Sequence, residues 1–438
     1  MLMTGRRRKK RRLALVLFAG IVILVVVIVN HCSSMHASLS AFNTSKESAP
    51  PPHLNEVLAN EMSSLPSLDR DMERYLQKWE IKGGQLAWSR HDTLLYSKGY
   101  GWANKEKNIP MQPSNIMRIA SVSKLVTAVG IMHLYDEGEI LLSDKVFGER
   151  GILNDSIYTK TIKDRRYYDI TIEHLLRHQG GFTTRAGDPM FVTRHIMQNN
   201  HLKEPPSNDK MLELQLRRRL AFTPGTSQYY SNFGYMILTL VIEKITGMDY
   251  EEYMQKEVLE PAGCYDFHLA HNYYEERRDN EVKYYVHGGC QPELEYNNSG
   301  KRVEKCYGGN DIANLRGAGG WTASASELIR FIATIDLDPR VADILDEKSV
   351  EIMTEDQPQG VFSLGWNSTH EGKPWSRTGS FAGTTALVLR YPDGDCMILL
   401  TNTSTWKGHG FSKETRQFFD RLRQKYSSQL PAQDLFYP

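Results

Sequence analysis

The stretch that decides the fold runs from residue 118 to residue 138 and reads RIASVSKLVTAVGIMHLYDEG. After Lys124 the side chains are apolar on nearly every face, which predicts a buried helix, and Gly138 is suited to end it. Ser121 begins this helix, and Lys124 lies one turn further along on the same face. The sequence therefore predicts a serine and a lysine side by side at the start of a buried helix.

The Ser-x-x-Lys spacing alone carries little information, because it occurs at Ser121/Lys124, Ser207/Lys210 and Ser404/Lys407. Ser207 lies in the polar segment PPSNDK, which predicts a loop. Ser404 follows a strand-like run and leads into another loop. Of the three pairs, we expect only Ser121/Lys124 to open a helix.

The expected burial gives the Ser121/Lys124 pair a chemical role. A lysine that loses its hydration has a lowered pKa, so its neutral amine can accept the serine proton. The helix N-terminus adds N–H groups beside the serine, where they can stabilise an oxyanion. The alternative is that Ser121 only caps the helix and that Lys124 lies at the surface.

A second pattern, Tyr-x-Asn, occurs at Tyr230/Asn232 and at Tyr296/Asn298. The first copy follows a Pro-Gly turn and precedes an apolar helix. A tyrosine beside a lysine cation ionises more easily and can act as a base, and an asparagine amide can bind a substrate amide. The alternative is that these residues only cap the helix. The second copy lies in a polar segment and predicts a solvated loop.

A third segment, WSRTGSFAGTTALVL, places Arg377, Thr378, Gly379 and Ser380 where one strand ends before the next. Gly379 lets the backbone pass close to a ligand, and Arg377 offers a bidentate donor for a substrate carboxylate. The Ser380 N–H is a candidate oxyanion donor, and Thr378 is a candidate substrate contact. The alternative is an arginine on an edge strand next to a tight turn.

The rest of the chain predicts strands at both ends and helices between them. Two strands and a turn are expected over residues 85–101. Further strands are expected at 361–367, 373–379, 383–391 and 395–402. Helices are expected at 68–80, 121–137, 171–178, 210–219, 234–246, 250–257 and 412–426. This order favours one sheet built from both ends of the chain, with an inserted helical region.

The N-terminal segment predicts a membrane anchor. Residues 13–29 are 17 consecutive residues without a polar side chain, and as a helix they span roughly 25 Å. Seven basic residues lie at 6–12, so residues 1–12 should stay cytoplasmic and the rest should lie outside the cytosol. Alternatives are a cleaved signal peptide and a lipoprotein modified at Cys32. We expect an anchor at 13–30, a stalk at 31–66, a catalytic domain at 67–428 and a C-terminal tail at 429–438.

Charge and composition exclude one class of partner. The chain has 53 basic and 52 acidic residues, and without the seven basic residues at 6–12 the balance is 46 to 52. A chain of that sign attracts nucleic acid poorly, so we expect no nucleic-acid partner. Cys290 and Cys306 flank a polar stretch, and whether they pair stays open. Five N-x-S/T sequons lie at Asn43, Asn154, Asn297, Asn367 and Asn402.

Taken together, the motifs resemble those of the serine β-lactamase/penicillin-binding superfamily. Within it the chain looks most like the class C β-lactamase-related branch, which also holds D-Ala carboxypeptidases, D-aminopeptidases and esterases. The resemblance covers roughly residues 70–425. It is carried by RIASVSK (118–124), ITIEHLLRHQGG (170–181), PGTSQYYSN (224–232), GGWTASASELIRF (319–331) and RTGSFAGT (377–384).

The resemblance implies a fold and a set of roles. The fold is an α/β (α+β) arrangement: an antiparallel sheet flanked by helices, with an all-helical subdomain and the site in the groove between them. Ser121 is the implied nucleophile, with Lys124 and Tyr230 sharing the proton transfer and Asn232 contacting the substrate. The backbone N–H groups of Ser121 and Ser380 are the implied oxyanion donors.

One residue departs from the family pattern. The third motif usually begins with lysine or histidine, and here it begins with Arg377. Arginine keeps the positive charge but does not release a proton at ordinary pH, so it cannot relay one. Efficient β-lactam hydrolysis is therefore less expected than acyl transfer in general.

These observations predict a membrane-anchored serine hydrolase that forms an acyl-enzyme on amide or ester substrates. Carboxylate-bearing substrates are favoured, among them D-amino-acid peptides, β-lactam-like compounds and esters. The alternative is a penicillin-binding-type receptor that binds or acylates without turnover. The expected partners are a small-molecule or peptide substrate and the membrane, and we expect no cofactor and no metal.

Overall fold

The computed structural model describes residues 52–437 apart from residues 186, 290–291 and 359. In these ranges, no helix has both the length and the apolar character needed to span a bilayer. The anchor predicted at 13–30 lies outside the described residues, as do the basic segment before it and Cys32. Residues 51–438 form one compact unit.

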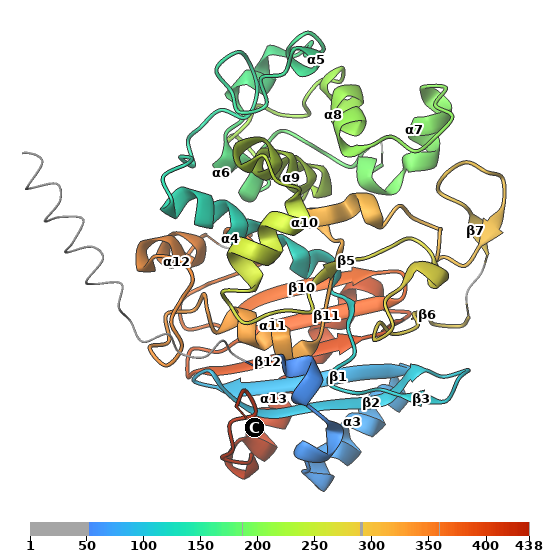
Figure 1. The fold of residues 1–438 in the computed structure, drawn as a ribbon, viewed down its shortest axis with the longest axis vertical. Helices are drawn as coiled ribbons and strands as arrows, with labels where there is room; N and C mark the ends of the chain where they lie inside the picture. Colours follow the sequence, from blue (N-terminus) through green and yellow to red (C-terminus); the bar gives the residue numbers. More distant parts are fainter. Residues whose placement is uncertain (1–51, 186, 290–291, 359, 438) are drawn as a thin grey trace, which may run out of the picture. The chain divides into compact units, whose positions relative to one another are not determined.

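The main sheet joins the two ends of the chain. Its order is β10-β11-β12-β1-β2-β3, with antiparallel pairing throughout. Strand β12 pairs with β1 at the centre, where Leu399 lies opposite Leu86. The prediction of a sheet built from both termini is confirmed (Figure 1). The strands are β1 (Gly83–Arg90), β2 (Thr93–Asn104), β3 (Ile109–Pro110), β10 (Trp375–Phe381), β11 (Thr384–Arg390) and β12 (Asp395–Thr401).

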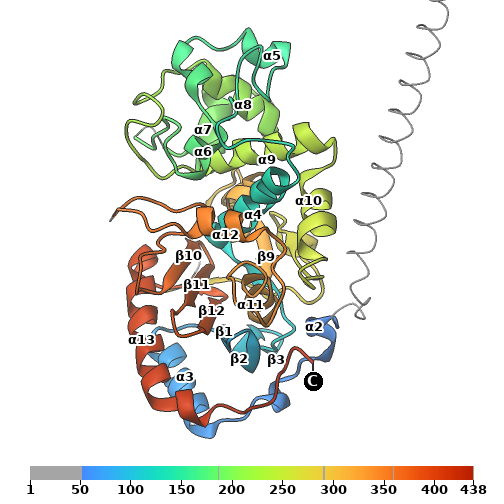
Figure 2. The ribbon, with the colours of Figure 1, turned by 90° about the vertical axis from the view of Figure 1, so that its left-hand side faces the viewer.

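Helices cover both faces of this sheet (Figure 2). On one face, α3 (Pro66–Lys78) and α13 (Phe411–Tyr426) bury their apolar residues against alternate side chains of the strands. The rings of Tyr75 and Phe418 stack there at 3.9 Å between centroids. On the other face lie α11 (Ala325–Ile332) and α4 (Ser123–Asp136). Because side chains alternate between the two faces of the sheet, each strand contributes to two separate cores.

The helical region between the two halves of the sheet is confirmed and lies at the top of Figure 1. Its longest helix, α9, begins at Asn232 because the Ser231 hydroxyl accepts the Gly234 N–H at 3.0 Å. Its helices are α5 (Ser156–Thr159), α6 (Ile172–Leu176), α7 (Thr193–Asn199), α8 (Asn208–Leu216), α9 (Asn232–Thr246) and α10 (Tyr250–Tyr253), and α10 continues as a π-helix at Met254–Leu259.

Short elements complete the unit. A three-stranded sheet has the order β4-β9-β5, and two further strand pairs are β13-β6 and β7-β8. The bounds are β4 (Met117–Arg118), β5 (His268–Leu269), β6 (Tyr285–Val286), β7 (Glu293–Leu294), β8 (Arg302–Val303), β9 (Trp321–Ala323), β13 (Thr403–Ser404), α2 (Leu54–Val57) and α12 (Glu347–Thr354).

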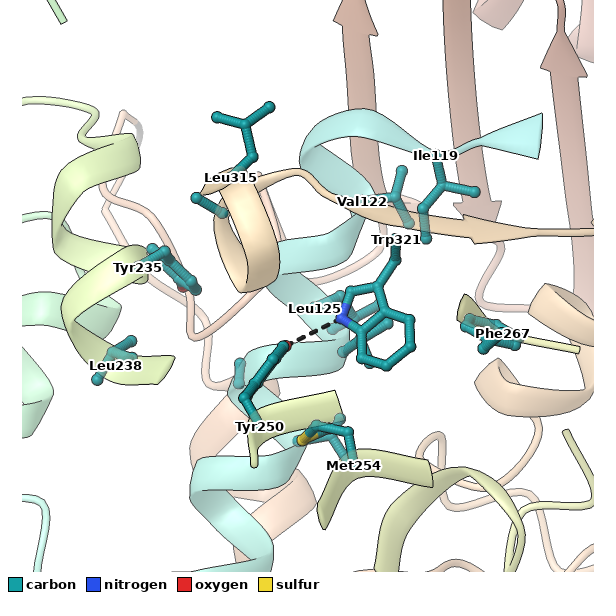
Figure 3. Packing of buried hydrophobic residues seen from close by; sticks show 14 of the residues in the cluster. Ile119, Val122, Leu125, Tyr235, Leu238, Tyr250, Met254, Phe267, Leu315 and Trp321 are labelled. Carbon is teal, nitrogen blue, oxygen red and sulfur yellow. Dashed lines mark hydrogen bonds between the residues drawn. The ribbon is translucent and has the colours of Figure 1, made fainter. Parts of the chain in front are cut away.

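The start of α4 is held by β9. Trp321 is fully buried, and its indole N–H donates to the Tyr250 hydroxyl at 2.9 Å (Figure 3). Its backbone N–H donates to Ser123 Oγ at 3.1 Å, and its carbonyl accepts the Ile119 N–H at 3.0 Å. The turn that carries Ser121 is therefore fixed by hydrogen bonds on both sides.

Two predicted boundaries are wrong. The stalk was expected to continue to residue 66, but Leu54 and Leu58 are buried in the main core. The tail at 429–438 is also packed: Leu435 and Phe436 are buried, and the Leu435 N–H donates to Leu94 O at 2.8 Å. Both segments are short and contain prolines, so their apolar residues did not stand out as parts of a core.

The strand predicted at 361–367 is also absent. Its apolar residues do not pair with a neighbouring strand; they cross over α4. Gly365 has a φ of +78°, and a Cβ there would lie 2.8 Å from the Ala128 Cβ. The close approach to α4 and the left-handed backbone explain both the glycine and the loss of strand geometry.

Two further predictions concern the cysteine pair and the sequons. Cys290 lies outside the described residues, so its pairing with the buried Cys306 stays a prediction. The Asn402 side chain is fully buried and donates to Trp102 O and to Lys283 O, each at 2.9 Å. That sequon is therefore inaccessible in the folded chain.

Candidate active site

Ser121 lies on a strained turn at the start of α4. Residues Ala120–Val122 form one turn of 3-10 helix before the α-helix begins. Ala120 has a φ of +48°, which is costly for a residue with a Cβ. Backbone strain of this kind persists only where the surroundings enforce it, and it concentrates at functional sites.

The Ser121 hydroxyl lies between a phenol and an amine. Tyr230 Oη is 2.7 Å from Ser121 Oγ, and Lys124 Nζ is 3.4 Å from the same oxygen. The tyrosine lies just before α9 and the lysine lies in the first turn of α4, so two segments separated by about a hundred residues meet here. The predicted Ser-Lys-Tyr cluster is present.

Lys124 is fully buried. Its Nζ donates to Asn232 Oδ1 at 2.6 Å and to the Ala318 carbonyl oxygen. Burial lowers the pKa of the Lys124 amine, and the positive charge of Arg377 lowers it further. The alternative that Lys124 is a surface residue is therefore wrong.

Tyr230 has an unusually acidic phenol for a buried tyrosine. Burial raises its pKa, but the positive charges of Lys124 and Arg377 outweigh this effect and hold the pKa below 10. The Lys124 Nζ also lies 4.8 Å from the centre of the Tyr230 ring. Lys124 and Tyr230 therefore form one coupled acid–base pair that shares its protons.

His178 packs against this tyrosine. It lies in the motif at 170–181, for which the sequence predicted no site residue. Its ring lies 4.5 Å from the Tyr230 ring, and its Nδ1 accepts the Ser231 N–H at 3.2 Å. Burial lowers its pKa well below the usual value, so the ring is neutral and does not compete for the serine proton. Phe362, from the segment that was predicted as a strand, packs against the His178 ring with 4.9 Å between the ring centroids.

Asn232 has a partner that sequence reasoning missed. Its Nδ2 donates to Asp188 Oδ2 at 2.7 Å, while its Oδ1 faces Lys124. Asp188 is held in turn by the Met190 N–H, which donates to its other oxygen at 3.0 Å. Because a carboxylate only accepts hydrogen bonds, Asp188 fixes which end of the Asn232 amide faces the lysine.

The Arg377 guanidinium binds the backbone of the nucleophile. It is buried, and its Nε and Nη2 both donate to the Ser121 carbonyl oxygen, at 2.8 and 2.6 Å. Nη2 also lies 3.5 Å from Tyr230 Oη. Two of its donors are thus used by the nucleophile's own backbone, and the expected carboxylate-binding role stays a prediction.

Gly379 brings β10 against the serine turn. A Cβ at this position would lie 2.2 Å from Ile119 O and 3.0 Å from Ser121 N. These distances are shorter than van der Waals contact, so only glycine fits without displacing the turn. The sequence predicted that Gly379 lets the backbone pass close to a ligand. In the structure, β10 passes close to the backbone of the turn that carries Ser121.

Ser380 lies on the open edge of the sheet. The Ser376 N–H donates to Ser368 O at 2.9 Å and the Thr378 N–H donates to Asn367 Oδ1 at 2.7 Å, so both point away from β11. Alternate N–H groups of a strand point the same way, which puts the Ser380 N–H next in this row. The Thr378 hydroxyl also donates to Asn367 Oδ1. Asn367 was not among the predicted site residues.

The other two Ser-x-x-Lys pairs lack this environment. Ser207 lies in a loop, as predicted, where it also caps α8, and Lys210 Nζ pairs with Glu213 at 2.5 Å. Lys407 pairs with Glu414. Neither lysine is buried. Burial of the amine, and not helix opening, separates Ser121/Lys124 from these copies.

Comparisons with known proteins agree with this geometry. Residues 68–419 match the family model described as Beta-lactamase. Penicillin-binding protein 4* of Bacillus subtilis (strain 168) is 24% identical over 340 residues, covering 74% of this chain and 69% of that protein. Protein flp of Staphylococcus aureus (strain N315) is 26% identical over 208 residues, covering 48% of this chain but only 38% of that protein.

Solved structures share the fold. The D-amino acid amidase from Ochrobactrum anthropi SV3, complexed with L-phenylalanine amide, superposes with a TM-score of 0.63 at 18% identity and covers 83% of this chain and 98% of its own. The octameric penicillin-binding protein homologue from Pyrococcus abyssi gives a TM-score of 0.59 at 20% identity, covering 84% and 78%.

Fold and site together define a class of protein in which a serine, a lysine and a tyrosine meet between an antiparallel sheet and a helical subdomain. The family match extends over most of the chain, and the ordered motifs fall inside it. The chain therefore belongs to the beta-lactamase family.

Proposed function

We propose that this protein is a serine hydrolase that forms an acyl-enzyme through Ser121 on amide or ester substrates. The observation that carries the proposal is the placement of two proton acceptors at one hydroxyl. Tyr230 Oη lies 2.7 Å and Lys124 Nζ lies 3.4 Å from Ser121 Oγ. Both have pKa values below their ordinary ones, which suits general-base catalysis.

In the proposed reaction, Ser121 Oγ attacks the substrate carbonyl carbon and its proton passes to the Lys124–Tyr230 pair. The carbonyl oxygen becomes an oxyanion, which the N–H groups of Ser121 and Ser380 stabilise. The carbonyl–heteroatom bond then breaks, and the departing nitrogen or oxygen takes the proton from the pair. Water releases the acyl group by the reverse sequence.

The substrate class is proposed from the relatives. One is named as a penicillin-binding protein, and one structural neighbour is a D-amino acid amidase. We propose amides of short D-amino-acid peptides, with β-lactam-like compounds and esters as alternative acyl donors. We propose that Asn232 contacts the substrate amide through the second N–H of its Nδ2, because its first N–H donates to Asp188 and its Oδ1 accepts from Lys124.

Covalent labelling tests the assignment of Ser121. Wild-type residues 52–438 should be labelled by a fluorescent penicillin or a fluorophosphonate, and Ser121→Ala should lose the label completely. Ser207→Ala is a matched control, because it makes the same change in another Ser-x-x-Lys pair, where the Ser207 hydroxyl only accepts the Lys210 N–H at the start of α8. Labelling that survives in Ser121→Ala would refute the proposal.

The lifetime of the label separates the hydrolase from a receptor. A hydrolase should release the acyl group within seconds to minutes, and it should show multiple turnovers on a chromogenic ester. An adduct that persists for hours, without turnover of amides or esters, would instead identify the penicillin-binding-type receptor.

We also propose that residues 13–30 anchor the chain, with the catalytic unit outside the cytosol. The 17-residue apolar run and the basic residues before it support this arrangement. In membranes from cells that express the full chain, the protein should resist extraction with alkaline carbonate and dissolve in detergent. A matched chain that begins at residue 52 should be released. Full-length protein in the carbonate supernatant would contradict the anchor.

A further inference from the structure

A cavity adjoins the site on the side of the helical subdomain. Its volume is about 150 Å³, and it lies between the loop that follows α6 and the segment that follows α8. Asp188 and Ser231 line it. Asp188 is one hydrogen bond from Asn232, and Ser231 lies between Tyr230 and Asn232 in sequence, so the cavity reaches the residues around the nucleophile.

The cavity is lined by an excess of positive charge. Arg185, Arg218 and Arg219 all contribute to its walls, against the single carboxylate of Asp188. That carboxylate is already engaged by the Asn232 Nδ2 and the Met190 N–H. The three arginines are exposed to solvent, and their like charges give this side of the subdomain a positive potential.

These three arginines differ from their neighbours in having no counter-ion in the described part of the chain. Arg166 pairs with Asp164 at 2.6 Å, and Arg217 pairs with Glu213. Arg218 makes only a 3.4 Å hydrogen bond to the Gln215 amide oxygen. An anionic group that entered the cavity would therefore find donors that are not yet committed.

Part of the remaining wall is apolar. Phe182, Leu220 and Phe233 line the cavity beside the arginines. A ligand that suits both kinds of surface has a short hydrocarbon chain that ends in a planar anion. A carboxylate fits this description best, because arginine binds it through two parallel N–H donors.

We propose that this cavity is a subsite for an acidic acyl group, so that preferred substrates carry a carboxylate a few carbons from the carbonyl that Ser121 attacks. This inference rests on the proposed function and specifies its substrate. It adds a source of carboxylate selectivity besides Arg377, whose Nε and Nη2 donate to the Ser121 backbone.

Paired chromogenic esters test the subsite. The 4-nitrophenyl monoesters of glutarate and adipate match 4-nitrophenyl valerate and hexanoate in acyl chain length, but they end in a carboxylate. The wild type should show a higher kcat/KM for the anionic member of at least one pair. In the Arg218→Gln/Arg219→Gln double variant, that value should fall about ten- to hundredfold, the size of one charge-assisted hydrogen bond.

The neutral esters provide the internal control, and their kcat/KM should stay within twofold of the wild type in the double variant. Arg217→Gln is the matched control variant. It lies in the same segment but pairs with Glu213 and does not line the cavity, so it should leave all four esters unchanged. Equal use of both members of each pair by the wild type, or an equal loss in Arg217→Gln, would overturn the subsite.

A binding measurement separates failure of the subsite from failure of the proposed function. Ser121→Ala protein should bind glutarate in isothermal titration calorimetry, and the triple variant that also carries Arg218→Gln and Arg219→Gln should not. If the wild type hydrolyses no ester but this difference in binding appears, the cavity stands and the hydrolase proposal fails. If esters are hydrolysed through Ser121 but glutarate does not bind, the subsite is wrong.

Discussion

Replacing Lys124 with methionine should lower the rate of acylation of Ser121 by about three to four orders of magnitude, at the upper end of what a positioned base contributes. Methionine is similar in length and carries no ionisable group, so it fills the buried site without accepting a proton. The second-order rate constant for labelling by a fluorophosphonate measures the effect directly.

The chain offers a close control for this substitution. Lys210→Met makes the same change in another Ser-x-x-Lys pair, where the lysine is exposed and paired with Glu213. It should leave labelling unchanged. Thermal unfolding of both variants checks that each is folded, because Lys124 Nζ is also bonded to Asn232 and to Ala318 O. A folded Lys124→Met protein that labels at the wild-type rate would remove the lysine from the mechanism.

The strands and helices could be predicted because their signals are local. Residues 83–104 alternate between the two cores, and α4 is apolar on all faces because it passes between the sheet and the helical subdomain. The sequence order of strands and helices was enough to predict that both ends of the chain share one sheet. The strand prediction at 361–367 is wrong because it also relied on a local apolar pattern. The apolar residues there pack on α4 and do not pair with a strand.

The pairwise arrangement of the site is less visible in the sequence. Ser121, Lys124 and Tyr230 stand in recognisable patterns, so their meeting could be anticipated. Asp188 lies in a loop without any pattern, and its role follows only from a 2.7 Å contact with Asn232. Nothing in the sequence around Asp188 marks it as a partner of Asn232, so this contact could be found only in the folded structure.

Arg377 illustrates a different limit. Its charge was correctly placed near the nucleophile, but the acceptor of its hydrogen bonds could not be derived from residue type, because a guanidinium can donate to a backbone carbonyl as well as to a carboxylate. The structure assigns both donors to Ser121 O. Its charge then lowers the pKa of Tyr230 and of Lys124.

Tyr230→Phe is the second substitution with a large expected effect. It removes the oxygen nearest to Ser121 Oγ and leaves the ring in place against His178 and Phe362. We expect the acylation rate to fall about 10²- to 10⁴-fold. Tyr229→Phe is the matched control: its hydroxyl contacts Thr184 at 2.8 Å and its side chain is 41% exposed, so the rate should not change.

The pH dependence of the wild type tests the same pair independently. A base that must be deprotonated loses activity as the pH falls through its pKa, and both Lys124 and Tyr230 have pKa values below their ordinary ones near 10. Acylation should therefore rise with pH and level off below pH 10, with the plateau set by the pair and not by either group alone. If the rate kept rising past pH 10, the phenol and the amine would be titrating as they do in free amino acids, and their burial beside Arg377 would have no catalytic consequence.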